Sequence, residues 1–275
     1  MSESTVQGGA APMGERSSYF IAAIGRALAV LDAFSPERPE LSLRSIAEIA
    51  GVTQPSALRI GYTLTQAGFM VRNPITKGYR LGPKAISVGM ATLNSLTLPE
   101  LADPYLVDLR NRTQETIKLA IHDGPRVVFI SRIPSLRHPP GNTYVGSSLP
   151  IHLSAMGRAI LAHLPEEEAR ALIEASEDRQ LTPRTPSKDT VVKGLAGIRQ
   201  RGYATNDQGI TVENRAVAAP LLDAEGRPAG AINLSMSAQR ITLGELKRTM
   251  APLLLETAAA ISAILPPQVQ GAGRS

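Results

Sequence analysis

The most regular pattern of apolar and polar positions in this 275-residue chain lies in residues 42–68. Its first part predicts a short helix, because apolar residues recur every three or four positions. These residues are Ile46, Ala47, Ile49 and Ala50. Ser42 suits the N-cap of this helix, since its hydroxyl can accept a free backbone N–H. Gly51 suits its end, where the chain turns through a left-handed conformation that glycine adopts without strain.

A second helix is predicted to begin after Thr53 as N-cap and to end at Gly68. Pro55 fits its first turn, where the missing N–H costs no hydrogen bond. The pattern separates two faces of this helix. The inward positions are Ala57, Ile60, Gly61 and Leu64, and the outward positions are Gln54, Ser56, Arg59 and Thr63.

Two short helices joined by a glycine turn, with polar residues at the start of the second, are typical of a helix-turn-helix. The second helix of such a motif fills the major groove of DNA. There Arg59 can pair with guanine and Gln54 with adenine, while Ser56 suits a base or a phosphate. Thr53, at the start of this helix, completes the predicted contact set. Taken alone, the pattern also fits a helical hairpin in another kind of α-helical domain.

The segment after this helix favours the DNA-binding interpretation. Residues 69–72 and 79–81 predict two strands, and the loop 73–78 between them is rich in turn-forming residues. A hairpin in this position is a wing. We expect Arg72 and Lys77, the cation at its tip, to lie along the phosphate backbone, where contacts give affinity rather than sequence reading.

Residues 19–34 predict the helix that completes this domain, and we expect its apolar face to pack on the two helices that follow. That face consists of Ile21, Ile24, Leu28, Leu31 and Phe34. Arg26 and Arg44 are either phosphate contacts or part of a solvated face. The sequence therefore predicts a winged helix-turn-helix over residues 19–82, preceded by a disordered tail of residues 1–18.

Residues 83–97 predict a stiff amphipathic linker helix. Its apolar positions exceed what either neighbouring domain needs, which indicates a dimer contact: Ile86, Val88, Met90, Leu93 and Leu96. A second domain is expected over residues 98–267, followed by a short tail of residues 268–275.

The second domain reads as α+β, because pairs of strands around tight turns alternate with helices. Ser154 is expected to cap the helix that it opens. The predicted strands are residues 116–121, 126–133, 215–222 and 228–236, and the predicted helices are residues 98–114, 154–164, 165–175, 189–201 and 242–265.

Composition narrows the class of protein. The chain has no cysteine, which excludes disulfides and thiolate metal sites and makes the reducing cytosol its natural compartment. It has no apolar run long enough for a membrane span. Residues 20–82 hold seven Lys and Arg against four Asp and Glu, so this domain is the better candidate for a polyanion.

Catalysis is not predicted. The histidines lack metal-binding spacing, and no hydrolase, phosphate-loop or dinucleotide-binding motif occurs. His152, Ser154 and Asp207 have the residue types of a hydrolytic triad. We do not expect them to form one, because the side chains of residues two apart, such as His152 and Ser154, rarely point to the same site. His122 and His138 are expected in exposed turns. We therefore predict no enzyme, no metal and no cofactor.

Several segments in this order and spacing resemble the IclR family of bacterial transcriptional regulators over residues 20–265. They are IGRALAVLDAF, the helix-turn-helix and wing, GSSLPIHLSAMGRAILAHLP, RQRGYATNDQGITVENRAVAAPLLD and GAINLSMS. The sequence around SAMGRAILA and the Asn-Asp-Gln run most resembles the branch that controls aromatic-acid catabolism, the PcaU, PcaR and PobR group. The resemblance implies a winged helix-turn-helix, a GAF-like effector domain, dimers or tetramers, and palindromic operator DNA.

The resemblance also implies an effector pocket. Positions that match it are Ala155, Met156, Asn206, Asp207, Ala216, Asn233 and Ser235, and the apolar walls are Leu149, Ile151 and Leu153. A helix N-terminus with nearby amide and hydroxyl groups suits a carboxylate. Arg132 and Arg158 are candidate carboxylate anchors. His152 is either a structural histidine or a ligand contact.

Three positions depart from the family pattern. Gln208 and Gly209 replace part of an acidic run, and Asn233 replaces a common serine, which leaves the identity of the ligand open. In the DNA-binding domain, Gly61 stands where a large apolar residue is usual. A glycine there costs about 1 kcal/mol of helix stability relative to alanine and lets the helix pack closer to a neighbour.

Two functions follow from these observations. The first is a regulator that binds double-stranded operator DNA as a homodimer or tetramer and responds to an aromatic or small organic carboxylate. The alternative is a small-molecule sensor that acts through a protein partner rather than DNA. Steep salt dependence would distinguish DNA binding from protein docking.

Overall fold

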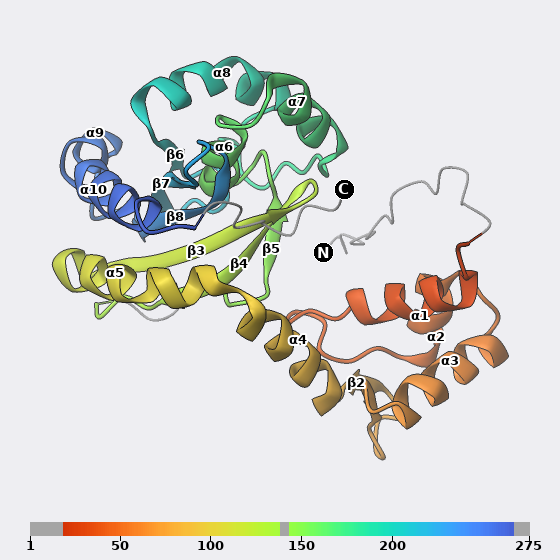
Figure 1. Ribbon diagram of the computed structural model, residues 1–275. Coiled ribbons are helices and arrows are strands. Elements are labelled where there is room, and N and C mark those ends of the chain that lie inside the picture. Colours follow the sequence, from red (N-terminus) through yellow and green to blue (C-terminus); the bar gives the residue numbers. More distant parts are fainter. Residues whose placement is uncertain (1–18, 138–142, 267–275) are drawn as a thin grey trace. The chain divides into compact units, whose positions relative to one another are not determined.

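The computed structural model describes residues 19–137 and 143–266. The chain divides between Asn94 and Ser95 into two compact units, which are described one at a time (Figure 1).

The first unit is a winged helix-turn-helix. Its helices are α1 (Ala22–Asp32), α2 (Leu43–Ala50), α3 (Gln54–Gln66) and α4 (Pro83–Ser95), and its wing strands are β1 (Met70–Arg72) and β2 (Tyr79–Leu81). The Ser42 hydroxyl accepts the Ser45 N–H, and Gly51 ends α2 with φ of 60°, both as predicted. Two backbone hydrogen bonds also join Leu41 to Tyr79, so a third short segment supports the wing.

The inward face of α1 differs from the prediction. Ile21, Ile24 and Leu28 are 54–62% exposed, whereas Val30 is fully buried. Leu31 and Phe34 of the predicted face do line the core of this unit, together with Ala27 and Val30, which form an adjacent stripe of the helix. Both stripes obey helical spacing, so periodicity alone could not decide which of them the other helices would cover.

The N-cap of α3 also differs from the prediction. Thr53 has the extended backbone of an N-cap, but its side chain makes no capping hydrogen bond. The Thr53 hydroxyl instead donates to the Ser56 hydroxyl at 3.2 Å. The helix begins where predicted, and Pro55 occupies its first turn.

The second unit contains a six-stranded antiparallel sheet with strand order β5-β4-β3-β8-β7-β6. Two strands, β5 and β6, were not predicted, because edge strands of three and four residues are too short to show alternation. The strands are β3 (Thr116–Asp123), β4 (Arg126–Ile133), β5 (Ser148–Pro150), β6 (Ala204–Asp207), β7 (Asn214–Leu222) and β8 (Pro228–Ser237).

Helices cover both faces of this sheet (Figure 1). Helix α6 (Ala155–Leu161), backed by α7 (Glu166–Ala175) and α8 (Lys188–Arg201), packs on one face, which we call the α6 face. Helices α5 (Thr97–Thr113) and α10 (Ala251–Ser262) contact the strands on the other side. The architecture is the predicted α+β arrangement of sheet and helices.

Two helix predictions need correction. The expected single helix over residues 242–265 consists of α9 (Leu243–Glu245), a π-helical turn (Leu246–Met250) and α10. Pro252 stands in the first turn of α10, where it has no N–H to continue the preceding ladder. Ser154 occupies the N-cap position of α6, but its hydroxyl does not cap the helix.

Candidate functional site

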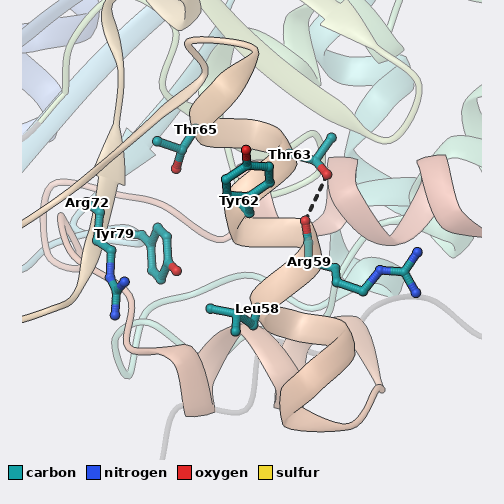
Figure 2. Close-up of a pocket in the computed structure, with 7 residues that line it drawn as sticks. All are labelled: Leu58, Arg59, Tyr62, Thr63, Thr65, Arg72 and Tyr79. Atoms are coloured by element: carbon teal, nitrogen blue, oxygen red, sulfur yellow. Dashed lines mark hydrogen bonds between the residues drawn. The ribbon is translucent and has the colours of Figure 1, made fainter.

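Helix α3 presents a polar face to solvent. Gln54, Arg59 and Thr63 are exposed and Ser56 is partly exposed. The Thr63 hydroxyl donates to the Arg59 backbone carbonyl at 2.8 Å. The Arg59 guanidinium has no hydrogen-bond or ion-pair partner in the described part of the chain. Figure 2 shows this guanidinium extending away from the wing. This face therefore offers donors and acceptors to an external ligand.

A hollow of about 400 Å³ lies between α3 and the wing (Figure 2). Tyr62 and Leu58 on α3 line it and are 64% and 44% exposed, and Tyr79 and Arg72 line it from the wing. The Arg72 guanidinium lies 5.7 Å from the centre of the Tyr79 ring. Leu58 and Tyr62 were not among the predicted contacts, although two large apolar groups on the outward side of this helix were the available signal.

The wing is held by one carboxylate. Glu40 accepts hydrogen bonds from the Asn73 amide at 3.2 Å, from the Arg80 guanidinium at 2.7 Å and from the Thr76 hydroxyl. The Thr76 and Arg80 hydrogen bonds hold the pKa of Glu40 below its usual value. The loop at the end of the hairpin is thus fixed by side chains as well as by its two short strands.

The predicted phosphate contacts lie in different surroundings. At the tip, Lys77 has φ of 60° and donates to the Pro74 carbonyl at 2.7 Å. Arg26 is exposed on α1, and Arg44 pairs with Glu48 within α2 at 2.9 Å.

In the second unit, the strand register brings most predicted effector residues onto one face. One row across four strands is Arg132, Lys118, Asn233 and Ala218. The row two residues along, which shares the same face, is Thr116, Ser235, Ala216 and Asn206. Ala218 packs in the core under α6, so both rows lie on the α6 face.

This cluster holds polar atoms without partners. Three buried atoms lack a hydrogen bond: the Arg132 Nε, the Asn233 Oδ1 and the Asn206 Nδ2. Water does not readily replace the missing partners of the two asparagines, because Asn233 and Asn206 are only 7% and 3% exposed. Buried polar groups are normally paired, so each such atom calls for an explanation. The two donors and the one acceptor are available to a polar ligand on this face.

Lys118 is the residue of this cluster that the sequence interpretation missed. Its ammonium lies 5.5 Å from the centre of the Phe129 ring. Burial, and then the charge of Arg132, lowers the pKa of Lys118 to about 8. The available signal was a lysine two residues from Ala120, on the side of an alternating strand that faces the core.

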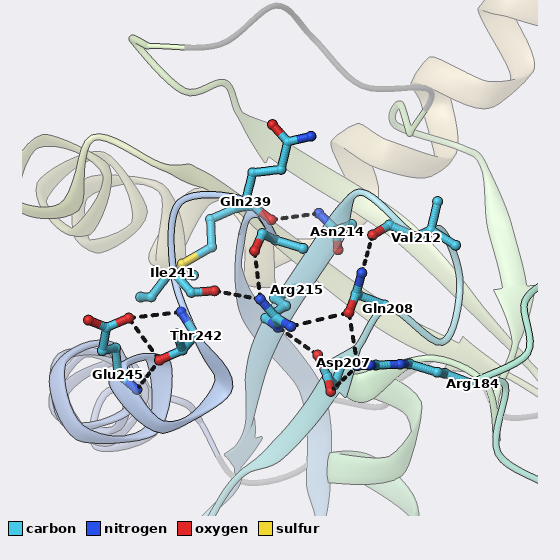
Figure 3. Close-up of polar contacts among 12 residues, drawn as sticks. Arg184, Asp207, Gln208, Val212, Asn214, Arg215, Gln239, Ile241, Thr242 and Glu245 are labelled. Atoms are coloured by element: carbon cyan, nitrogen blue, oxygen red, sulfur yellow. Dashed lines mark hydrogen bonds and ion pairs between the residues drawn. The ribbon is translucent and has the colours of Figure 1, made fainter.

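Asp207 belongs to a different network, shown in Figure 3. It follows Asn206 on β6, so its side chain lies on the opposite face of the sheet. One carboxylate oxygen accepts from Arg215 at 2.6 Å and the other from Arg184 at 2.8 Å. Gln208, with φ of 62°, accepts from both arginines as well. These contacts tie Asp207 to the β6–β7 loop, on the face of the sheet away from the other predicted effector residues.

Arg158, the second candidate carboxylate anchor, lies on α6. It is 7% exposed, and its guanidinium donates to the Thr205 carbonyl of β6 at 2.8 Å. Burial lowers its pKa to about 10. No carboxylate pairs with it among the described residues, so it remains a candidate anion anchor.

His152 is fully buried just before α6. The Ser176 hydroxyl donates to the Ile173 carbonyl at 2.9 Å, so the Nδ1–H of His152 donates to that hydroxyl. Burial lowers the pKa of the imidazole, whose Nε2 has no partner. These contacts support the structural role for His152 that the sequence left as one of two alternatives.

Other predicted positions are apolar core or lie elsewhere. His122 is a half-buried residue of β3 rather than an exposed turn residue, and His138 lies outside the described residues. Leu149 is partly buried against the core beneath α6, and the fully or almost fully buried positions are Ile151, Leu153, Ala155 and Met156.

Within the described ranges, no group of three or more His, Asp or Glu residues has the geometry to hold a metal ion. The same ranges contain no helix with the length and apolar character needed to cross a bilayer.

Comparison with known proteins gives matches along the chain. Residues 90–263 match the family model described as bacterial transcriptional regulator IclR C-terminal, and residues 23–74 match the IclR helix-turn-helix domain. The HTH-type transcriptional regulator XynR of Escherichia coli is 32% identical over 231 residues, 82% of this chain and 90% of XynR. The Pca regulon regulatory protein of Pseudomonas putida is 28% identical, over 86% of this chain and 81% of its own length.

Solved structures share the fold. The structure of a transcriptional regulator from Rhodococcus sp. RHA1 superposes with a TM-score of 0.73 and 30% identity, over 89% of this chain and 98% of that one. An IclR homologue from Microbacterium hydrocarbonoxydans, solved in complex with 4-hydroxybenzoate, gives a TM-score of 0.69 at 21% identity, over 88% and 98% of the two chains.

Proposed function

The chain belongs to the IclR family of bacterial transcriptional regulators, and from this we propose that it binds operator DNA through α3 and the wing and responds to a small carboxylate held on the α6 face. The observation that carries the DNA half is the exposed polar face of α3 beside a hairpin pinned by Glu40.

In the proposed complex, α3 lies in the major groove. The free guanidinium of Arg59 reads guanine, and Gln54 reads adenine. Ser56 and Thr53 contact the DNA bases or phosphates that lie near the first turn of α3. Arg72 and Lys77 follow the phosphate backbone on the wing side, while Arg26 and Arg44 give weaker contacts. The hollow beside Tyr62 and Leu58 receives the sugar-phosphate strand.

We propose that two copies bind a palindromic site and that dimers can pair into tetramers. Helix α4 has no buried residue in the described chain, and Ile86, Val88 and Met90 on it are 47–69% exposed. This exposed apolar face of α4 suits a second copy, and the exposed stripe of α1 offers another apolar surface. Half-sites are then expected about one helical turn of DNA apart, or a multiple of it. Because its target is genomic DNA, we place the protein in the bacterial cytoplasm.

The proposed effector is an aromatic or small organic carboxylate. The unpaired amide N–H of Asn206 and the cations Lys118 and Arg132 on the same face favour an anion. Relatives named for the Pca regulon and for p-hydroxybenzoate hydroxylase, and the relative solved with 4-hydroxybenzoate, point to aromatic acids.

The exposed Leu58 and Tyr62 also favour a second function, in which α3 docks a protein partner. One titration separates the two. Fragments selected from genomic DNA should bind the protein with an affinity that falls steeply between about 50 and 200 mM salt, because phosphate contacts release counterions. If no fragment is retained better than bulk DNA, with or without a carboxylate, the DNA-binding proposal is wrong.

A further inference from the structure

Lys118 and Arg132 are directly opposite each other on strands β3 and β4. Side chains of directly opposed residues lie on the same face of a sheet, so the two cations are neighbours on the α6 face. On its other side, Lys118 is opposite Asn233 of β8. The three residues form one row, which we call the cation row.

The cation row lacks an acidic partner. The ion pairs in residues 19–137 and 143–266 involve neither Lys118 nor Arg132. The Arg132 Nε has no hydrogen bond, and neither has the Oδ1 of Asn233, a side chain more than nine-tenths buried. Two like charges side by side, half-buried and without a counter-ion, disfavour each other in the unliganded protein.

Charge balance sets the class of ligand. A monocarboxylate would compensate one of the two cations and leave the other half-buried without a partner. A ligand with two carboxylates compensates both, because each cation then faces one negative charge. The Phe129 ring beside Lys118, and Ala218 opposite Asn233, belong to the apolar core under α6, so apolar side chains border the cation row.

We propose that the effector of this protein is a small organic dicarboxylate whose two carboxylates pair with Lys118 and Arg132. This inference rests on the proposed function, since it names the class of carboxylate that the effector site takes. The resemblance to the family does not supply this pair of cations, because Lys118 is not among the positions that match the family's effector pocket.

The test compares matched acids on the full-length protein by thermal shift and calorimetric titration. The pairs are phthalate or terephthalate against benzoate, and adipate against hexanoate. At least one dicarboxylate should bind the wild type about tenfold or more tightly than its monocarboxylate partner, since one compensated charge is worth roughly that factor. In Lys118→Met this preference should fall to about twofold or less.

Two control variants separate charge from folding. Lys118→Arg keeps the cation and should keep the preference for dicarboxylates, whereas Lys193→Met removes an exposed lysine of α8 and should change nothing. Phenyl phosphate is included because a phosphate monoester also carries two charges.

Three results would overturn the inference: monocarboxylates that bind as tightly as dicarboxylates, phenyl phosphate that binds more tightly than every dicarboxylate, or an absence of binding by all of these acids. Operator binding is measured separately on the same samples. A protein that binds dicarboxylates but no DNA fragment would refute the DNA-binding function alone, and the reverse result would refute only the dicarboxylate site.

Discussion

The ring of Tyr79 lies directly against the α-carbon of Gly61. A β-carbon on Gly61 would be 2.9 Å from the ring Cζ and 3.1 Å from the hydroxyl oxygen. Tyr79 is only 3% exposed and is tied to Leu41 by two backbone hydrogen bonds of 2.8 Å. The ring therefore has little freedom to move, and helix α3 meets the wing at a contact that needs glycine.

We expect Gly61→Ala to destabilise the first unit by about 1–3 kcal/mol, because the clash with Tyr79 outweighs the roughly 1 kcal/mol gained in helix propensity. Hydrogen exchange of α3 and β2 measures the effect locally. Gly194→Ala in α8 is the matched control, since no atom lies within 4 Å of the added carbon, and it should stabilise the second unit by about 0.5–1 kcal/mol. Equal gains in both variants would show that the Tyr79 contact imposes no constraint.

The two arginines of the DNA-binding surface should behave differently. Arg59→Ala is expected to cost about 1–3 kcal/mol on a selected operator and little on random DNA, because its free guanidinium reads a base. Arg72→Ala should weaken both kinds of DNA alike and reduce the slope of log affinity against log salt by about 1. Anisotropy titrations at several salt concentrations give both quantities. Equal losses on both DNAs for Arg59→Ala would make Arg59 a phosphate contact.

Local chemistry made part of this fold predictable. The Ser42 cap, the Gly51 turn and the wing hairpin each depend on residues close in sequence, and the structure has all three. The buried face of α1 could not be predicted in the same way, because it depends on which stripe of the helix its neighbours cover. Val30 rather than Ile24 is buried.

The effector site shows the same division. Placement of Asn206 and Asp207 on opposite faces needed strand β6, which is too short to recognise from alternation. Lys118 could be assigned only when the register set it between Arg132 and Asn233. Residues brought together across strands far apart in sequence leave no periodic signal of their meeting.

Lys118→Met should stabilise the unliganded protein at neutral pH by about 1–2 kcal/mol, because it removes a cation whose burial opposes its charge. The pKa of Lys118 falls from 10.5 to about 8 on folding. The unfolded chain therefore binds more protons between these values, and the wild type gains stability from this residue as the pH rises through that range. The charged group facing it from the neighbouring strand is Arg132, while Asn233 on the other side is neutral.

Denaturant titrations of the wild type and Lys118→Met across this pH range measure the difference. The advantage of the variant should shrink as the pH approaches 10.5. A stability difference that does not change with pH would mean that the lysine is fully solvated in the folded protein.

Neighbouring residues on β6 give the last test, because Asn206 faces α6 and Asp207 faces away from it. Asn206→Leu removes an unpaired buried amide, so it should leave stability unchanged or slightly higher while it weakens carboxylate binding about tenfold or more. Asp207→Asn should cost about 1–3 kcal/mol of stability, since it uncouples Arg215, which is 15% exposed at its side chain, from its carboxylate. It should leave the ranking of carboxylates unchanged, because its contacts hold the loop and not the ligand. Thermal unfolding and titration of both variants with the same acids measure these effects, and a changed ligand ranking in Asp207→Asn would return that residue to the effector site.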